Sequence, residues 1–173
     1  MRRTLTGENV TLRPITYRDT DLVVAWRNNE RVRRNFIYRG MFTREIHLHW
    51  MDTMVCDGDV IQYIIEHDGV PIGSVYFRDI DKKNRNAEFG IFIGEDSAVG
   101  RGFGTEAAKL FIDYGFSALN LHRISLRVLP HNKRAIHVYK KIGFMEEGFF
   151  RDLVTLDGSW SDVIFMAILN QEE

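Results

Sequence analysis

Residues 86–116 read NAEFGIFIGEDSAVGRGFGTEAAKLFIDYGF, and this stretch decides the fold. From Glu88 to Ile93 polar and apolar residues first alternate and the residues then become apolar. This pattern predicts a strand that is buried over most of one face. Its last part repeats apolar residues with helical spacing, which predicts a helix that packs one face on a sheet. The apolar stripe of that helix consists of Ala107, Ala108, Phe111, Ile112 and Gly115. The segment between the strand and the helix contains Gly100, Gly102 and Gly104.

The order of strand, glycines and helix predicts an anion-binding site. The first N–H groups of a helix have no partner within it, the helix dipole is positive there, and glycine lets an anion approach the backbone. Arg101 adds a charge that favours a phosphate. The alternative is that the glycines only let the loop turn. No GK[ST] sequence follows, which excludes a P-loop, and the next strand lacks the acidic residue that a dinucleotide site uses for the ribose.

The composition is that of an ordinary globular protein. With 173 residues, of which 45% are apolar, we expect a single domain over residues 1–173. The 23 basic and 24 acidic residues give a net charge of −1, which excludes a strongly basic surface for nucleic acid or membranes. The one cysteine, Cys56, cannot form an internal disulfide, and this favours a reducing cytoplasm. No spacing of histidines or carboxylates indicates a metal site.

The rest of the chain predicts more strands and helices on either side of this stretch. The other expected strands are residues 9–15, 60–67, 70–80, 123–129, 144–150 and 160–169. The other expected helices begin near Asp19, Thr43 and Asn132, each of which can cap a helix. The helix after Thr43 should bury Ile46, Trp50, Met51, Met54 and Val55. This order predicts an α+β or mixed α/β fold, a sheet with helices on both faces.

Two motifs and the order of elements resemble one family, the GCN5-related N-acetyltransferases, or GNAT proteins. The motifs are the glycine loop and N-x-R-A-x₃-Y-x₃-G-F at residues 132–144. The resemblance implies a mostly antiparallel, twisted sheet whose middle strands splay apart. It also implies acetyl-CoA as the co-substrate, with the pantetheine between the splayed strands, the pyrophosphate on the glycine loop, and no metal.

The two halves of the chain resemble different branches of this family. The segments RNAEFGI, LNLHRISLRV and NKRAIHVYKKIGF are similar to spermidine and ribosomal-protein N-terminal acetyltransferases. The segments AWRNNERVRR and EIHLHWMDTM resemble acetyltransferases that act on nucleotide-linked 4-amino sugars. The two halves therefore imply different acceptors.

The resemblance also implies which residues bind acetyl-CoA. The backbone of Phe92 and Ile93 should bond to the pantetheine amides in the manner of an added strand. The loop residues are Val99, Gly100, Arg101, Gly102, Phe103, Gly104 and Thr105. The family usually has Gln or Arg where this chain has Val99, which removes one side-chain donor. Further contacts are expected from Asn132, Arg134 and Lys141, although Asn132 could instead cap its own helix and a surface lysine could simply be solvated.

Two side chains are candidates for the chemistry. Acetyl transfer needs a neutral amine and a proton for the departing thiolate. By the resemblance, the Tyr139 hydroxyl reaches the CoA sulfur as the acid, and the alternative is a core tyrosine. Glu88 lies in an apolar strand where desolvation would raise its pKa, so it is the candidate base through a water. The alternatives for Glu88 are an ion pair with Arg78 or Arg85, or a contact with a cationic substrate.

The residues Trp26, Arg27, Asn28 and Arg31 are the candidate acceptor site. Four arginines lie within residues 27–34, a pattern that suits an anionic acceptor such as a nucleotide diphosphate and disfavours spermidine. The alternative is a solvated helix end. We therefore expect direct attack by a small amine, such as a nucleotide-linked amino sugar, in a ternary complex.

Other functions remain open from the sequence. The alternative acceptors are a polyamine and a protein N-terminus of the ribosomal type. A non-catalytic acyl-CoA-binding module is the alternative from another class. Family relatives are often homodimers, and Trp160 or the terminal hairpin could supply such a contact.

Overall fold

The computed structural model describes residues 3–171, and all of its strands belong to one eight-stranded sheet with the order β1-β2-β3-β4-β5-β6-β8-β7. The strands are β1 (Leu5–Thr6), β2 (Thr11–Pro14), β3 (Ile61–His67), β4 (Val70–Asp81), β5 (Asn86–Ile93), β6 (Arg123–Val128), β7 (Met145–Leu156) and β8 (Ser159–Leu169). Every pair of neighbours is antiparallel except β5 and β6. The expected mixed α+β fold with a mostly antiparallel sheet is confirmed.

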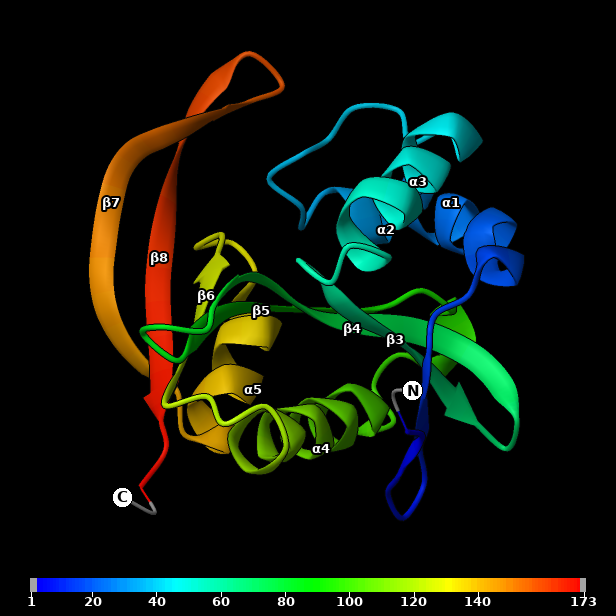
Figure 1. Cartoon of the computed structure of the whole chain (residues 1–173). Helices are drawn as coiled ribbons and strands as arrows, with labels where there is room; N and C mark the ends of the chain where they lie inside the picture. Colours follow the sequence, from blue (N-terminus) through cyan, green and yellow to red (C-terminus); the bar gives the residue numbers. More distant parts are fainter. Residues whose placement is uncertain (1–2, 172–173) are drawn as a thin grey trace.

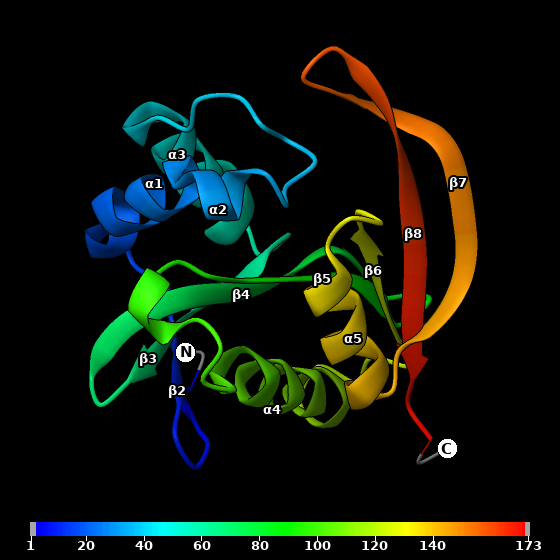
Figure 2. The same cartoon turned by 180° about the vertical axis from the view of Figure 1, so that it is seen from behind.

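Helices cover both faces of the sheet (Figures 1 and 2). One face carries α4 (Phe103–Ser117) and α5 (Lys133–Ile142), and the other carries α1 (Thr20–Asn28), α2 (Glu30–Arg33) and α3 (Arg44–Trp50). Capping residues set several of these helix starts: the Thr43 side chain accepts a hydrogen bond from the Ile46 amide, and Asn132 accepts one from the Ala135 amide. Within residues 3–171, no helix has the length and apolar character needed to cross a membrane.

The main core lies between α4 and the sheet. The predicted stripe of α4 is buried, and its Phe111 stacks on Phe77 with ring centroids 4.4 Å apart. Gly115 lets the helix come close, because a Cβ atom there would lie 2.8 Å from the Phe77 ring. The periodicity of residues 103–117 therefore predicted correctly which face packs on the sheet.

The sheet splits between β5 and β6, and this split creates the space for a site. The two strands pair in parallel only at Asn86–Arg123, Ala87–Ile124 and Glu88–Ser125. Beyond Glu88, β6 continues to pair with β8 but no longer with β5. Within the described residues, the rest of β5 has no strand on that side, so its backbone groups there are available to a ligand.

The helix after Thr43 differs from its expected form. It ends at Trp50 and continues as one π-helical segment, Met51–Val55, closed by a hydrogen bond from the Cys56 amide to the Met51 carbonyl. A π turn adds a residue to the repeat, so one α-helical period does not describe the whole segment. The predicted burial of Ile46, which lies before this segment, is wrong: it is 38% exposed, whereas its neighbour His47 is 1% exposed because α3 turns that side chain toward Thr20 of α1.

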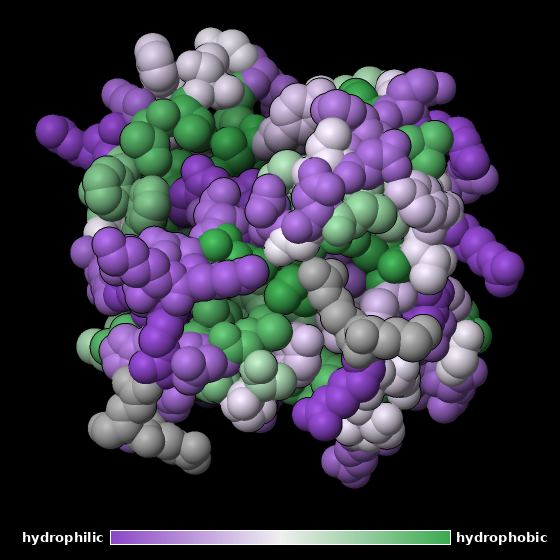
Figure 3. All heavy atoms as spheres, viewed as in Figure 1, coloured by the Kyte–Doolittle hydropathy of each residue, from purple (hydrophilic) through white to green (hydrophobic). Residues whose placement is uncertain are grey.

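The C-terminal hairpin projects beside the α1–α3 layer, and its outer strand β7 is a sheet edge (Figures 1 and 2). Large apolar side chains are exposed on it: Met145, Phe149, Phe150, Leu153 and Trp160. In the view of Figure 3, apolar residues gather at the upper left, over this hairpin. The structure thus leaves an apolar surface on the element that the sequence analysis named as a dimer contact.

Candidate active site

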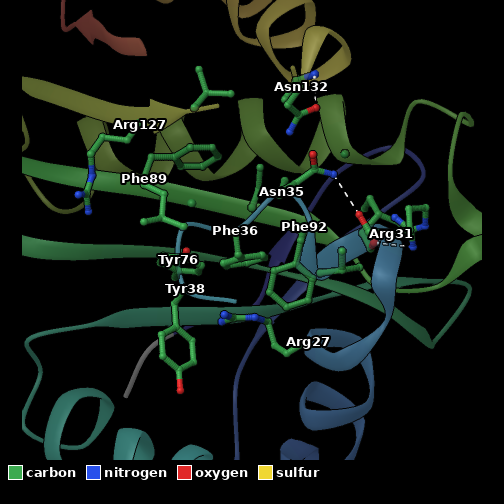
Figure 4. A pocket seen from close by; sticks show the side chains of 18 of the residues that line it. Arg27, Arg31, Asn35, Phe36, Tyr38, Tyr76, Phe89, Phe92, Arg127 and Asn132 are labelled. Atoms are coloured by element: carbon green, nitrogen blue, oxygen red, sulfur yellow. Dashed lines mark hydrogen bonds between the residues drawn. The ribbon is translucent and has the colours of Figure 1, made fainter. Parts of the chain in front are cut away.

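A cleft of about 1070 Å³ opens at the split in the sheet. Its walls come from β4, β5, the glycine loop, the start of α5 and the α1–α3 layer. In Figure 4, Asn132 at the start of α5 and Arg27 from α1 lie on opposite sides of this cleft. The cleft is therefore built from both halves of the chain.

The glycine loop forms one end of the cleft. Gly100 and Gly102 have φ angles of +82° and +86°, which favour glycine, and Gly102 is the residue directly before α4. A Cβ atom at Gly102 would meet nothing within 4 Å, so the space over the start of α4 is open. The loop residues that line the cleft are Val99, Gly100, Gly102, Phe103, Gly104 and Thr105.

The predicted basic contacts are divided between the cleft and the surface. Arg134 lines the cleft, and its guanidinium would lie 3.5 Å from a Cβ atom at Gly100. Arg101 does not line the cleft, and its guanidinium carbon lies 4.7 Å from the centroid of the Phe103 ring. Lys141 is exposed on α5 and also lies outside the cleft. Only Arg134 of these three is placed to meet a phosphate in the cleft.

The β5 backbone and the start of α5 line the middle of the cleft. The Phe92 ring is buried against Trp26 and Phe36, with centroids 6.2 and 5.5 Å away. The Ile93 carbonyl already accepts a hydrogen bond of 3.0 Å from Arg31. Asn132 lines the cleft and also caps α5, so the alternative role named for it is present in the structure.

Tyr139 on α5 borders both the core and the cleft. Its ring meets Phe89 edge-on at 6.3 Å and Phe144 at 5.7 Å. Burial raises the pKa of Tyr139 well above its usual value, and Tyr76 nearby adds to the shift. The hydroxyl is therefore protonated at neutral pH and can donate into the cleft.

Glu88 lies in a different environment from the one expected. Its carboxylate accepts hydrogen bonds of 3.1 Å from Arg78 Nε and from Arg127 Nε, and a further one from Arg78 Nη2. The interpretation of Glu88 as a desolvated base among apolar side chains is wrong in this respect, because β4 and β6 each place a guanidinium beside it. The alternative of an ion pair with Arg78 is present, whereas Arg85 bonds to Asn120 instead.

The four candidate acceptor residues have separate roles. Trp26 is 3% exposed and donates to Glu95 Oε1 at 2.6 Å, and Asn28 exchanges hydrogen bonds with the Phe42 backbone. Neither lines the cleft. Arg31 lines it, but its guanidinium donates to Asp96 at 2.7 Å and to the backbone carbonyls of Ile93 and Gly94 at the end of β5. Of these four residues, Arg27 alone lines the cleft with a guanidinium that has no hydrogen-bond partner among the described residues.

Sequence reasoning missed several residues that line the acceptor end. These are Phe36, Tyr38, His47, Tyr76, Arg78 and Arg127. Tyr76 on β4 pairs with Gly90 on β5, and its ring lies over that glycine. A Cβ atom on Gly90 would be only 2.2 Å from the Tyr76 ring. A glycine inside a strand, opposite an aromatic residue, was the signal that could have pointed to it. Among the described residues, no group of His, Cys, Asp and Glu side chains could hold a metal ion.

Comparisons with known proteins agree with this geometry. Residues 9–145 match the family described as acetyltransferase (GNAT) domain. Spermidine N(1)-acetyltransferase of Escherichia coli K12 is 33% identical, over 96% of this chain and 89% of that protein. The N-acetyltransferase p20 of Bacillus licheniformis, described as uncharacterized, is 31% identical over 98% of this chain and 97% of that protein. The crystal structure of spermidine N-acetyltransferase from Vibrio cholerae with CoA and spermine has a TM-score of 0.88 at 28% identity, covering 94% of this chain and 96% of that one.

Proposed function

This chain belongs to the GNAT family and is an acetyl-CoA-dependent N-acetyltransferase, and we propose that it acetylates a primary amine of a small molecule by direct attack in a ternary complex. The observation that carries the proposal is the split between β5 and β6, which opens beside the glycine loop and under Tyr139. A thioester placed in this split has the helix N-terminus at one end and the acceptor space at the other.

The residues of this chain have defined roles in the proposed reaction. The loop amides and Arg134 hold the phosphates of CoA, and the free edge of β5 bonds to its pantetheine. The amine nitrogen attacks the thioester carbonyl carbon, the carbon–sulfur bond breaks, and the sulfur takes the Tyr139 hydroxyl proton. The proton that the amine gives up returns to Tyr139 through solvent, so the enzyme ends in its starting state.

Glu88 has another role in this proposal. Because two guanidinium groups occupy its oxygens, we assign it to holding Arg78 and Arg127 in place at the acceptor end. The amine is then deprotonated by water instead of by this carboxylate.

The comparisons support a polyamine as the acceptor, which the sequence analysis named as an alternative, and they do not support the amino sugar. Two of the three proteins cited above are spermidine acetyltransferases by name, and the crystal structure of one of them contains spermine. Spermidine and spermine are therefore the first acceptors to test. A specific observation favours testing anionic amines beside them: Arg27, Arg78 and Arg127 line the acceptor end, and Glu88 is the one acidic residue among the described residues that line the cleft.

Three further proposals concern the whole chain. We treat residues 1–173 as a single domain, because every described strand belongs to one sheet. The single cysteine supports placing the reaction in the reducing cytoplasm. The exposed apolar side chains of the β7–β8 hairpin support a homodimer through that hairpin.

The proposal is tested by following thiol release from acetyl-CoA with a panel of amines. The panel holds spermidine, spermine, a nucleotide-linked 4-amino sugar, and peptides with free Ser or Ala termini. Release that depends on the amine, with the acetylated product seen by mass spectrometry, is the expected result. Binding of acetyl-CoA without turnover of any amine would contradict it and would favour a non-catalytic acyl-CoA-binding protein.

A further inference from the structure

Arg27 has a partly buried guanidinium with no hydrogen-bond or ion-pair partner among the described residues. Its side chain lines the cleft, and its guanidinium carbon lies over two aromatic rings, 3.6 Å from the centroid of Phe36 and 4.6 Å from that of Phe42. Its Nε atom is fully buried and has no hydrogen-bond partner among the described residues. Burial lowers the pKa of Arg27, but an arginine stays protonated at any physiological pH. A partly desolvated positive charge therefore lies at the acceptor end of the cleft.

The surroundings of Arg27 supply no negative charge. The groups that act on it are the hydroxyls of Tyr38 and Tyr76 and the positive charge of Arg78. Figure 4 shows Arg27 extending beneath Phe36 toward Tyr38 and Tyr76. The carboxylate of Glu88 is already shared between Arg78 and Arg127. The acceptor end thus carries more positive than negative charge.

Arg27 differs from the other arginines of this region, which are either paired or exposed. Arg34 also lines the cleft without an ion pair among the described residues, but its side chain is exposed to solvent. Arg31 is paired with Asp96, Arg39 with Asp157, and Arg44 with Asp21. A buried, unpaired charge is costly, and proteins keep such charges chiefly where a ligand completes the pair. The two aromatic rings restrain the guanidinium at the wall of the cleft, and a guanidinium can bind a carboxylate or phosphate through two hydrogen bonds.

We propose that Arg27 is an anion receptor in the acceptor site, and that the acceptor carries a carboxylate or phosphate on the same molecule as the reacting amine. This inference rests on the proposed acetyltransferase function and narrows its acceptor class. Tyr76 lines the same cleft as Arg27 and Tyr139, so the receptor and the candidate acid belong to one continuous site. An anion on Arg27 would fix one end of the acceptor, and the amine at the other end would face the thioester.

Matched pairs of amines test this proposal. Ornithine is putrescine with an added carboxylate, and phosphoethanolamine is ethanolamine with an added phosphate. We expect kcat/KM for the anionic member of at least one pair to exceed that of its partner by about tenfold or more, the effect of one charged hydrogen-bonded pair. The two pairs also distinguish a carboxylate from a phosphate. Equal values within both pairs, or faster turnover of the unsubstituted amines and spermidine, would overturn the proposal.

Variants connect the preference to Arg27. Arg27→Gln should remove the preference for the anionic member while the Kd for acetyl-CoA stays unchanged, which also shows that the variant is folded. Arg27→Lys keeps the charge but loses the planar fork, so it should keep part of the preference. The control is Arg44→Gln, which removes a positive charge from the same helical layer outside the cleft and should keep the full preference. A preference that survives Arg27→Gln would overturn the proposal.

Two further measurements separate this proposal from the function it rests on. If no amine is turned over, calorimetry with ornithine and putrescine on the acetyl-CoA complex still tests the receptor, and equal or undetectable binding of both would overturn it. If succinyl-CoA is preferred over acetyl-CoA and Arg27→Gln removes that preference, the anion lies on the acyl donor and the assignment to the acceptor is overturned.

Discussion

Tyr139 combines a core position with access to the cleft. Its ring packs on Phe89 and Phe144, which fixes its orientation, while its edge lines the cleft. Burial keeps its hydroxyl protonated at pH values above its usual pKa of about 10. A fixed, protonated hydroxyl suits the donation of a proton to a leaving thiolate.

We predict that Tyr139→Phe lowers kcat by about 10²-fold or more, the usual contribution of a general acid, with little change in the Kd for acetyl-CoA. Phenylalanine keeps the ring packing, so the melting temperature should stay close to that of the wild type. The control is Tyr114→Phe, a buried tyrosine of α4 outside the cleft, which should keep kcat. Equal losses of kcat and of acetyl-CoA affinity in Tyr139→Phe would instead assign it a packing role.

His47 makes the stability of the protein depend on pH. Burial lowers its pKa from 6.5 to about 4, its Nδ1 lies 3.1 Å from the Thr20 hydroxyl, and its Nε2 is buried without a partner among the described residues. The unfolded chain binds a proton at this histidine below about pH 6.5, whereas the folded protein does not until about pH 4. The contribution of neutral His47 to the free energy of unfolding is therefore fully present above pH 6.5 and is lost as the pH falls toward 4.

The free energy of unfolding of the wild type should fall between pH 7.5 and pH 4.5. We predict that this fall is smaller in His47→Gln, by up to about 3 kcal/mol, because the variant has no histidine to protonate on unfolding. Urea denaturation at the two pH values measures this difference. His49→Gln, an exposed position on the same helix, should behave like the wild type. The same pH dependence in His47→Gln and in the wild type would contradict the prediction.

Individual side chains of the site were predictable only in part. Tyr139 and Asn132 belong to a local motif, and Asn132 also has a local capping function, so the sequence was sufficient to select them. The partners of Glu88 come from β4 and β6, and only the strand register brings Arg78 and Arg127 to it. Arg27 was predicted from the sequence as one of four candidate acceptor residues. The sequence could not show that Arg27 has no acidic partner, because this depends on where the folded chain places its Asp and Glu side chains.

At the level of elements, local signals predicted most of the boundaries. Asp68 and Gly69 both have positive φ and form the predicted turn between β3 and β4, and Gly143 ends α5 with a φ of +120°. The two-residue strand β1 and the π turn after α3 were not predicted. A strand that short has too few residues for alternation, and a π turn breaks the period on which the prediction depends.

In the glycine loop, two glycine variants can distinguish the effect of backbone strain from the effect of lost acetyl-CoA binding. We predict that Gly102→Ala and Gly58→Ala each lower the free energy of unfolding by about 1 kcal/mol, because both residues have a φ near +87°. Gly58 lies in a turn away from the cleft, so only Gly102→Ala should also weaken acetyl-CoA binding. Chemical denaturation and calorimetry measure the two effects. A similar loss of acetyl-CoA affinity in both variants would mean that the loop does not contact the cofactor.

At the scale of the whole molecule, the site depends on a split in the sheet that no local pattern shows. β5 reads as an ordinary buried strand, yet it pairs with β6 over only three residues before the strands part. The split follows from where β6, β8 and α5 lie, which is a property of the topology. The resemblance to a family implied this feature, whereas composition and periodicity did not.

The exposed hairpin leads to a prediction about assembly. We predict that the protein is a homodimer in solution and that Trp160→Glu, at a side chain that is 69% exposed, converts it to a monomer, because a buried, unpaired charge is costly in an apolar interface. Light scattering after size-exclusion chromatography measures the mass. Val70→Glu at the start of β4, also an exposed apolar position, is the control and should leave the mass unchanged. A wild-type monomer, or a Trp160→Glu dimer, would contradict the prediction.

Thiol release from acetyl-CoA tests the central claim most directly. It should be measured for the wild type and for Tyr139→Phe with spermidine, putrescine and ornithine, together with the Kd for acetyl-CoA. We predict release that requires an amine, is lost in Tyr139→Phe, and is accompanied by unchanged acetyl-CoA affinity. Wild-type protein that binds acetyl-CoA but acetylates no amine, or a Tyr139→Phe variant with full turnover, would contradict the proposed mechanism.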